Sequence, residues 1–271
     1  QSASVCEATG LPLSVRSERP RRIDRYQLDR RLGRGGFGSV YSGHHVHTRR
    51  RVAIKLLKAP LTAEPQMVAR FKQEARALAA VKSDRVVEVL DWGVLPTGES
   101  FLVMELLEGQ NLLHFMNDRG GRLDVAHALG LLRQLLEALE EVHAAGVVHR
   151  DLKPSNIFVT ERDGAEFVQL VDFGISKVPR DLRGISTSGG ATRLGTPGFM
   201  APEQLFGESD VRVDIFAAGV VAYRMFSGRL PWPAADMQAY ARQVTNDDPQ
   251  PLAAVAPVSD GLSRIIMRAL D

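Results

Sequence analysis

Four polar residues suited to catalysis lie in two short segments in the middle of the chain. Asp151, Lys153 and Asn156 are close together in the sequence, and Asp172 follows a short apolar run. Asp151 could accept a proton from an alcohol, and Asn156 and Asp172 offer the oxygen ligands that Mg²⁺ prefers. Lys153 could neutralise charge on a phosphoryl group in transfer. Any one of these residues is more simply explained as part of a surface turn, but the set in this order predicts a catalytic site.

A glycine-rich turn lies between two strand-like runs, 26–33 and 39–43. It contains Gly33, Gly35, Gly36 and Gly38. Glycines allow the backbone to pass close over phosphates and to direct N–H groups at them. No helix follows the turn, which excludes a dinucleotide-binding turn, and no Lys-Ser/Thr pair follows it, which excludes a Walker A loop. A glycine turn by itself could equally do no more than connect two strands.

Lys55 follows three apolar residues in the next strand-like run. A charge in a central strand is costly unless it is paired. Glu74 is the natural partner, because it shares a helix face with Phe71 and Leu78. A phosphate would be a second partner for the ammonium group. The alternative is a lysine at a strand end that reaches solvent.

The overall composition argues against a nucleic-acid partner, an internal disulfide and a membrane span. Lys and Arg number 34 and Asp and Glu 32, so the net charge of the 271-residue chain is +2, which gives no reason to expect a nucleic-acid partner. Cys6 is the only cysteine, so an internal disulfide is excluded and a reducing compartment is favoured. The longest apolar candidate, residues 215–223, is far shorter than the roughly 18 residues that a membrane span needs. We therefore expect no membrane contact within this chain.

The elements that must position these residues change in type along the chain. Residues 1–22 lack strand or helix periodicity and predict a flexible tail. An arm that binds a membrane or nucleic acid is the weaker alternative, because Glu7 and Glu18 dilute the positive charge. Strand-like runs with one helix continue to about residue 105, and the chain then becomes mainly helical. An apolar stripe marks the first long helix, which ends at Gly146: Ala128, Leu132, Leu135, Leu139 and Val142. The pattern predicts a small β-rich lobe, a connector at 105–109 and a larger helical lobe, with a ligand site between the lobes.

In combination, these motifs resemble the eukaryotic-like protein kinase superfamily, and the resemblance covers residues 26–271. The motifs are Gly33–Val40, Lys55, Glu74, His149–Asn156, Asp172–Gly174 and Ala201-Pro202-Glu203. The resemblance implies an α+β, bilobal protein-kinase-like fold with a five-stranded antiparallel β-lobe carrying one helix and a larger, mainly helical lobe. It divides the kinase domain, 23–271, into an N-lobe (23–105), a hinge (105–109) and a C-lobe (110–271), which we expect to stop before the last helix of the fold.

The resemblance also implies an ATP site between the lobes. The glycines of the turn would cover the phosphates, and Lys55, fixed by Glu74, would hold the α and β phosphates. Residues implied around adenine are Leu32, Val40, Ala53, Met104 and Phe158, with backbone hydrogen bonds from Glu105 and Leu107. The family usually has Leu where Phe158 stands, so the floor of the pocket would be bulkier. Met104 is implied as the gatekeeper, although Met is more often a core filler.

The same resemblance implies roles for the two central loops. Asp151 would orient the substrate hydroxyl and accept its proton, with Lys153 beside the transferring group, while Asp172 and Asn156 would each hold a Mg²⁺ ion. His149 is implied as a packing residue rather than a base, stacked with Leu78, Val89 and Phe173 and anchored by Asp214.

Further segments imply which residues the enzyme phosphorylates and how it is activated. The run 151–154 and the run 195–203 resemble those of Ser/Thr-specific members, and most of all the eukaryotic-like kinases of bacteria. Arg150 would bind a phosphate on the segment between residues 172 and 203 and order it. Thr192 is the first candidate for that phosphate and Thr187 and Ser188 the next, whereas Thr196 would hydrogen-bond Asp151 and Lys153. A flexible loop whose hydroxyls are only solvated is the alternative.

The resulting hypothesis is an ATP- and Mg²⁺-dependent serine/threonine protein kinase that phosphorylates protein substrates and its own activation segment, with a transient homodimer for reaction in trans. A pseudokinase or scaffold of the same fold is the alternative, and a small-molecule kinase is a third possibility. We expect the chain to act in the cytoplasm, either alone or as the cytoplasmic part of a longer, membrane-anchored protein.

Overall fold

The computed structural model describes residues 22–34, 38–57, 72, 75–173, 197–207 and 210–271. Seven of the candidate site residues lie outside the described residues: Gly35, Gly36, Glu74, Thr187, Ser188, Thr192 and Thr196. Cys6, Phe71, Gly174 and residues 1–21 of the expected tail also lie outside them.

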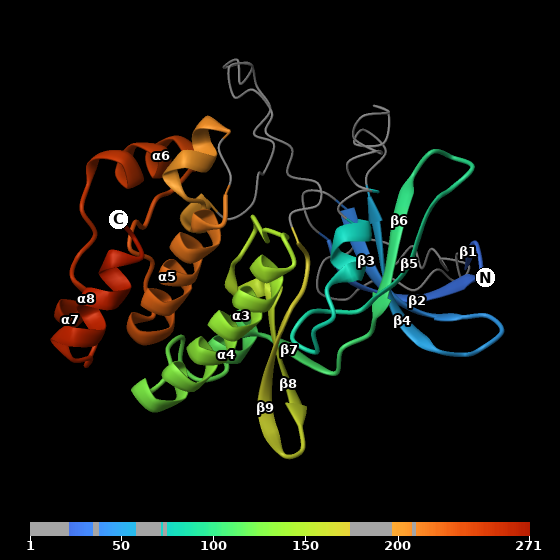
Figure 1. The fold of residues 1–271 in the computed structure, drawn as a ribbon, viewed down its shortest axis with the longest axis horizontal. Helices are drawn as coiled ribbons and strands as arrows, with labels where there is room; N and C mark the ends of the chain where they lie inside the picture. The colour runs from blue at the N-terminus through green and yellow to red at the C-terminus, as the bar shows by residue number, and fades with distance from the viewer. Residues whose placement is uncertain (1–21, 35–37, 58–71, 73–74, 174–196, 208–209) are drawn as a thin grey trace, which may run out of the picture.

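The N-terminal part forms one antiparallel sheet of six strands in the order β1-β2-β3-β4-β6-β5 (Figure 1). The strands are β1 (Arg22–Ile23), β2 (Tyr26–Arg34), β3 (Gly38–His45), β4 (Arg51–Leu57), β5 (Val89–Val94) and β6 (Ser100–Glu105). The prediction of five strands is wrong by one, because residues 22 and 23 turn back and pair with the start of β2. A strand of two residues carries no periodicity that a sequence pattern could reveal. Residues 75–80 of this part are helical.

The two faces of this sheet bury different sets of side chains. On β4, Val52, Ile54 and Leu56 belong to a small core on one face of the sheet. Ala53 and Leu57 belong to the main core on the other face. Because successive side chains of a strand point to opposite faces, Lys55 shares the Ala53 face and points toward the main core and the site between the lobes.

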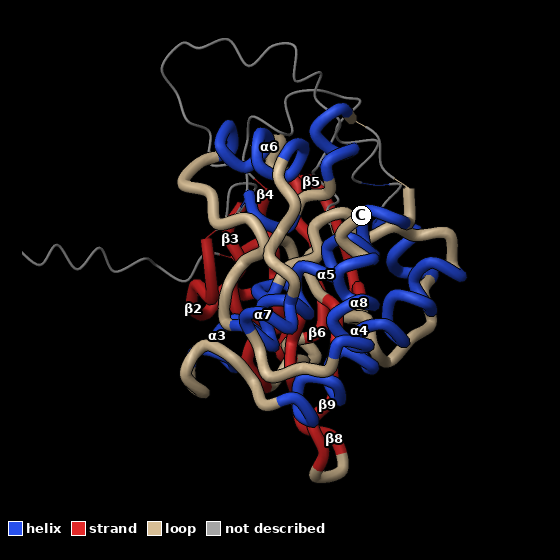
Figure 2. Tube along the Cα trace, turned by 90° about the vertical axis from the view of Figure 1, so that its left-hand side faces the viewer, coloured by secondary structure: helices blue, strands red, loops and turns tan. Residues whose placement is uncertain are grey.

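The C-terminal part combines a small sheet with helices. The sheet has the order β7-β8-β9, with β7 (Gly109–Asn111), β8 (Ile157–Arg162) and β9 (Ala165–Leu170). Figure 2 shows the β8–β9 hairpin at one end of the molecule. The helices are α3 (Leu112–Asn117), α4 (Val125–Ala144), α5 (Arg212–Ser227), α6 (Met237–Asn246), α7 (Leu252–Val255) and α8 (Asp260–Arg268). None of the helices in the described ranges has the length and apolarity needed to cross a bilayer.

Local signals explain where these helices begin and end. The Asp124 carboxylate accepts a hydrogen bond from the backbone N–H of His127 at the start of α4, and Ser259 does the same for α8. Gly228 ends α5 in the left-handed conformation, which glycine adopts without strain. The apolar stripe predicted for α4 is largely correct, although Leu131 is buried where Leu132 was expected.

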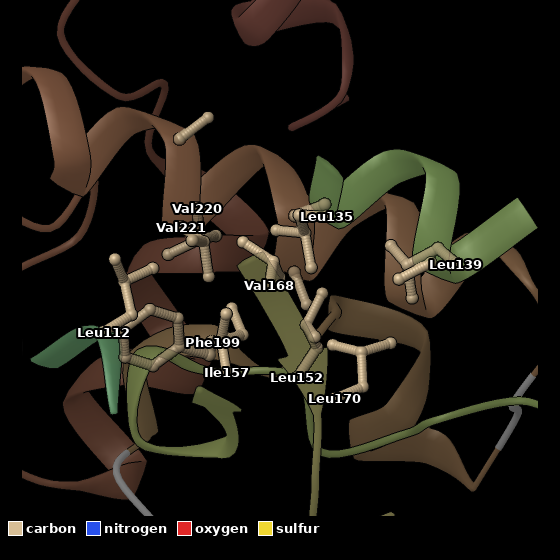
Figure 3. Close-up of a cluster of buried hydrophobic side chains, with 14 of the residues drawn as sticks. Leu112, Leu135, Leu139, Leu152, Ile157, Val168, Leu170, Phe199, Val220 and Val221 are labelled. Carbon is tan, nitrogen blue, oxygen red and sulfur yellow. The ribbon is translucent and has the colours of Figure 1, made fainter. Parts of the chain in front are cut away.

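Helix α5 forms the centre of the helical lobe. Nearly every residue from Val213 to Ser227 is buried, so this helix is covered on all sides rather than on one stripe. Figure 3 shows Val220 and Val221 of α5 facing Leu135 of α4 and Phe199. Leu152, Ile157 and Leu170 lie in the same cluster. The loops that follow α4 and β9 are therefore tied directly to the core.

Candidate active site

A buried carboxylate at the start of α5 holds the loop after α4. Asp214 is 0 % exposed and accepts hydrogen bonds from the backbone N–H groups of His149 (2.7 Å) and Arg150 (2.8 Å). Its Oδ2 also lies 2.8 Å from Nε2 of His143. Arg150 has a φ of 62°, a strained value for a residue with a side chain, which persists because these hydrogen bonds define the turn.

His149 packs inside the protein beneath this loop. Its ring centroid lies 4.4 Å from that of Phe173, and its Nε2 lies 3.1 Å from the carbonyl oxygen of Val171. The backbone N–H of Asp151 donates to its Nδ1 at 3.3 Å. A neutral imidazole protonated at Nε2 satisfies both contacts, and burial lowers the pKa of His149. The expected stacking on Phe173 and anchoring by Asp214 are confirmed.

Asp151, Lys153 and Asn156 converge on the outer side of the same loop. Lys153 Nζ donates to Oδ2 of Asp151 at 3.0 Å. Asn156 Nδ2 donates to the same oxygen at 3.1 Å and to the backbone oxygen of Asp151 at 2.8 Å. Leu152, between Asp151 and Lys153, is 2 % exposed and points into the core (Figure 3). Core packing of Leu152 thus presents its two polar neighbours on the opposite side.

Lys55 and Asp172 connect the two lobes at the site. The Lys55 ammonium lies 3.0 Å from Oδ1 of Asp172. Asn156 Nδ2 reaches the backbone oxygen of Asp172 at 3.4 Å, which links this pair to the loop of Asp151. The structure therefore brings together Lys55, Asp151, Lys153, Asn156 and Asp172, as the sequence predicts.

The residues expected around adenine lie on adjacent strands. Ala53 pairs with Met104 across β4 and β6, and Val40 pairs with Lys55 across β3 and β4. Ala53 and Met104 are buried in the main core, and Leu32 is 44 % exposed.

The connector and the C-lobe supply the other expected adenine contacts. The backbone N–H of Glu105 donates to the carbonyl of Glu88 at 3.0 Å, so this N–H is not available to adenine. Leu107 packs against the main core. Phe158 is half-buried and pairs with Asn111 and Gln169 in the small sheet.

Gly38 is required by close approach of two backbones. A Cβ atom at this position would lie 2.0 Å from the carbonyl oxygen of Leu56, whereas one at Gly33 would meet nothing within 4 Å. β3 can therefore approach β4 this closely at Gly38 only when residue 38 lacks a side chain.

The oxygen donors of the site suit Mg²⁺. Asp172 contributes a carboxylate and Asn156 an amide oxygen, both of which are hard ligands. No cluster of three or more His, Cys, Asp or Glu is found among the described residues. Two protein ligands match an ion that completes its shell with phosphate oxygens and water.

Two residues of the site were not predicted from the sequence. His143 contacts Asp214 from the last turn of α4. Gln204 accepts from the N–H of Ala201 at 2.9 Å and donates to the carbonyl of Arg150 at 3.1 Å. Gln204 thereby joins the segment after residue 196 to the catalytic loop. Its position directly after Ala201-Pro202-Glu203 was the available signal.

Comparison with known sequences decides the family. The family described as "Protein kinase domain" matches residues 26–263. The chain belongs to the protein kinase domain family. The prediction of this superfamily is confirmed.

Curated relatives of this kinase domain include serine/threonine kinases of bacteria, which confirms the predicted likeness to the bacterial members. The domain is 42 % identical to Serine/threonine-protein kinase Pkn1 of Myxococcus xanthus over 92 % of this chain and 36 % of that protein. It is 36 % identical to PknA of Mycobacterium tuberculosis over 84 % of this chain and 52 % of that protein. This chain therefore spans about a third to a half of the length of these relatives.

The crystal structure of the Mycobacterium tuberculosis PknI kinase domain is similar to this kinase domain. The TM-score is 0.72 at 26 % identity, and the match covers 93 % of this chain and 90 % of that one. The double mutant C20A_R136A of the same domain gives a TM-score of 0.74. The bilobal α+β fold expected from the sequence is confirmed by these structures.

Proposed function

We propose that this chain is a serine/threonine protein kinase that transfers the γ-phosphoryl group of ATP to hydroxyl groups of proteins. One observation carries the proposal: Lys55 from the β-lobe and Asp151, Asn156 and Asp172 from the helical lobe meet at one site. A chain of hydrogen bonds connects Lys55 to Asp172, Asp172 to Asn156 and Asn156 to Asp151. A cation, a base and two oxygen ligands are the parts that phosphoryl transfer requires. The bacterial relatives are named as kinases of this class.

We assign each side chain a role that its contacts support. Lys55 binds the phosphates, and the glycine turn covers them with backbone N–H groups. Asp172 and Asn156 would hold Mg²⁺, which neutralises phosphate charge when it is bound. Asp151 accepts the proton of the incoming hydroxyl, while Lys153, 3.0 Å from Asp151, stabilises the transferring group. Catalysis is then mainly positioning and charge stabilisation.

The choice of an active enzyme over a pseudokinase rests on residue types. Lys55, Asp151, Asn156 and Asp172 all retain groups capable of their part in the reaction, and hydrogen bonds link all four. The segment containing Ala201-Pro202-Glu203 is tied to the catalytic loop through Gln204, which favours a protein over a small molecule as the substrate.

We further propose that the enzyme switches itself on. A phosphate on Thr192, Thr187 or Ser188 would pair with Arg150 and order the segment before residue 197, with reaction in trans through a transient dimer. Residues 1–22 would be a tail to a kinase domain of 23–271. The cytoplasm, where ATP is abundant, is the proposed location.

The decisive experiment compares the parent chain with Asp151→Asn. Both are incubated with Mg²⁺ and labelled ATP, and phosphorylated residues are identified by mass spectrometry. We expect label on Ser and Thr in the parent and a loss of about 10²–10⁴-fold in rate in the variant, as is usual when a general base is removed. Nucleotide binding, measured by calorimetry, and the melting temperature should be unchanged in Asp151→Asn. Nucleotide binding without transfer in the parent would instead identify a pseudokinase.

A further inference from the structure

An arginine near the end of α5 carries a charge that the described residues leave unbalanced. The side chain of Arg224 is half-buried, and its guanidinium carbon lies 6.0 Å from the centroid of the Phe199 ring. No carboxylate among the described residues pairs with it, and burial lowers the pKa of this guanidinium. A desolvated cation without an anion is costly, so the position suits a ligand that supplies one.

The position of Arg224 is explained only in part by the helix itself. A cation in the last turn of a helix is stabilised by the helix dipole, and Arg224 lies in that turn. An exposed side chain would obtain the same stabilisation. Burial against Phe199 therefore requires a further reason.

Phe199 belongs to the segment that borders the catalytic loop. It ends the 3₁₀ turn η3 (Pro197–Phe199), and the segment continues to Gln204, whose side chain donates to the carbonyl of Arg150. Arg150 directly precedes Asp151. A substrate chain that lies along this segment while it presents its hydroxyl to Asp151 would pass close to Arg224.

A second arginine reinforces the positive charge there. Arg229 is exposed, and the neighbouring Leu230 lies so close to Gly198 that a Cβ atom on Gly198 would meet Leu230 Cδ1 at 2.8 Å. Arg229 likewise has no ion pair within the described parts of the chain. Arg224 thus lies beside Phe199, and Arg229 directly precedes the residue that packs against Gly198.

We propose that Arg224, assisted by Arg229, makes this kinase select protein substrates that carry an aspartate or glutamate near the acceptor Ser or Thr. The inference rests on the proposed kinase function and names the class of its substrate. The substrate carboxylate pairs with the guanidinium in a charge-assisted hydrogen bond, the stronger kind of hydrogen bond. Arg224 is therefore a specificity-determining residue rather than a catalytic one.

A scanned peptide series tests this selection. Each peptide has one Ser acceptor in an alanine background, with Asp, Asn or Lys placed in turn at each flanking position, and kcat/KM is measured for each. For the parent we expect about a tenfold preference for Asp over Asn at one or more positions, as a charge-assisted bond would give. Arg224→Met should abolish the preference, Arg224→Lys should retain part of it, and Arg224→Glu should favour Lys at the same position.

Two controls separate selectivity from loss of structure. Arg224→Met removes a charge without a described ion-pair partner and gives up only its modest stabilisation by the helix dipole, so its melting temperature should stay close to that of the parent. Arg268→Met, on an exposed residue of α8, should leave peptide preference unchanged.

Either of two results would overturn the inference while leaving the kinase function intact. One is a parent that phosphorylates peptides without preference for acidic residues, and the other is a preference that survives in Arg224→Met. If the parent phosphorylates neither itself nor any peptide, the proposed function falls, and this inference falls with it.

Discussion

The ammonium group of Lys55 lies 3.0 Å from Oδ1 of Asp172, although 117 residues separate the two in the chain. Lys55 belongs to the central strand β4 of the small lobe, and Asp172 follows β9 of the helical lobe. The Lys55 side chain is only 14 % exposed, so its charge is stabilised chiefly by this partner in the described structure. The pair fixes where the two lobes face each other.

Replacing Lys55 with Met should remove phosphoryl transfer without unfolding the domain. The methionine keeps most of the side-chain volume but loses the cation that binds phosphate, and losing one such electrostatic group typically lowers kcat by about 10²–10³-fold. Initial rates with saturating peptide measure the effect. Circular dichroism spectra matching those of the parent would show that the fold is kept, and near-parental rates would contradict the role given to Lys55.

Gly38→Ala should destabilise the small lobe. The new Cβ would overlap the carbonyl oxygen of Leu56, so β3 must move away from β4 at a cost of about 1–3 kcal/mol in the free energy of unfolding. Denaturant titration measures this cost. Gly33→Ala is the matched control, because its Cβ meets nothing within 4 Å, and its stability should stay within about 0.5 kcal/mol of the parent. Equal losses in both variants would show that the close approach of β3 and β4 is not the cause.

Asp214→Asn should weaken both stability and activity. An amide retains one acceptor oxygen but loses the charge that holds the N–H groups of His149 and Arg150, and the expected loss is about 3 kcal/mol. Chemical denaturation measures the loss of stability, and the rate of peptide phosphorylation measures the loss of activity. Asp210→Asn serves for comparison, because the Asp210 carboxylate is exposed and its hydrogen bonds within the described part of the chain all go to the nearby Arg212, and its stability should hardly change. A small effect at both positions would refute the anchoring role of Asp214.

The burial of His149 predicts a distinct dependence of stability on pH. The folded protein lowers the pKa of His149 below 6.5, so below about pH 6.5 the unfolded chain takes up a proton that the folded chain does not. This residue therefore makes folding less favourable as the pH falls through that range, and it has no effect above it.

The comparison of the parent with His149→Phe isolates this contribution. Both are unfolded with urea between pH 5 and 8, and the difference in their free energies of unfolding is plotted against pH. The advantage of the parent should shrink as the pH falls below about 6.5, because phenylalanine cannot be protonated. A difference in free energy of unfolding that stays constant over the whole pH range would mean that His149 is protonated as readily in the folded state as in the unfolded one.

The sequence by itself determined the chemistry of this protein and the type of most of its elements. Carboxylates, amides, lysines and glycines at these spacings limit what reaction can be done, because reactivity belongs to the side chain and its near neighbours. The strand and helix periods of 2 and 3.6 residues are likewise local. This is why β4 and α4 could be anticipated, while the two-residue strand β1 could not.

Only the tertiary structure decided how these groups meet. The contact of Lys55 with Asp172, the support of Asp214 by His143 and the bond from Gln204 to Arg150 join segments far apart in the chain. Such contacts exist because burial of α5, Leu152 and the β4 face in one core repays the entropy of closing the long loops between them. That Arg224 has no ion-pair partner among the described residues is likewise visible only in the tertiary structure, because its partners are decided by its neighbours in space.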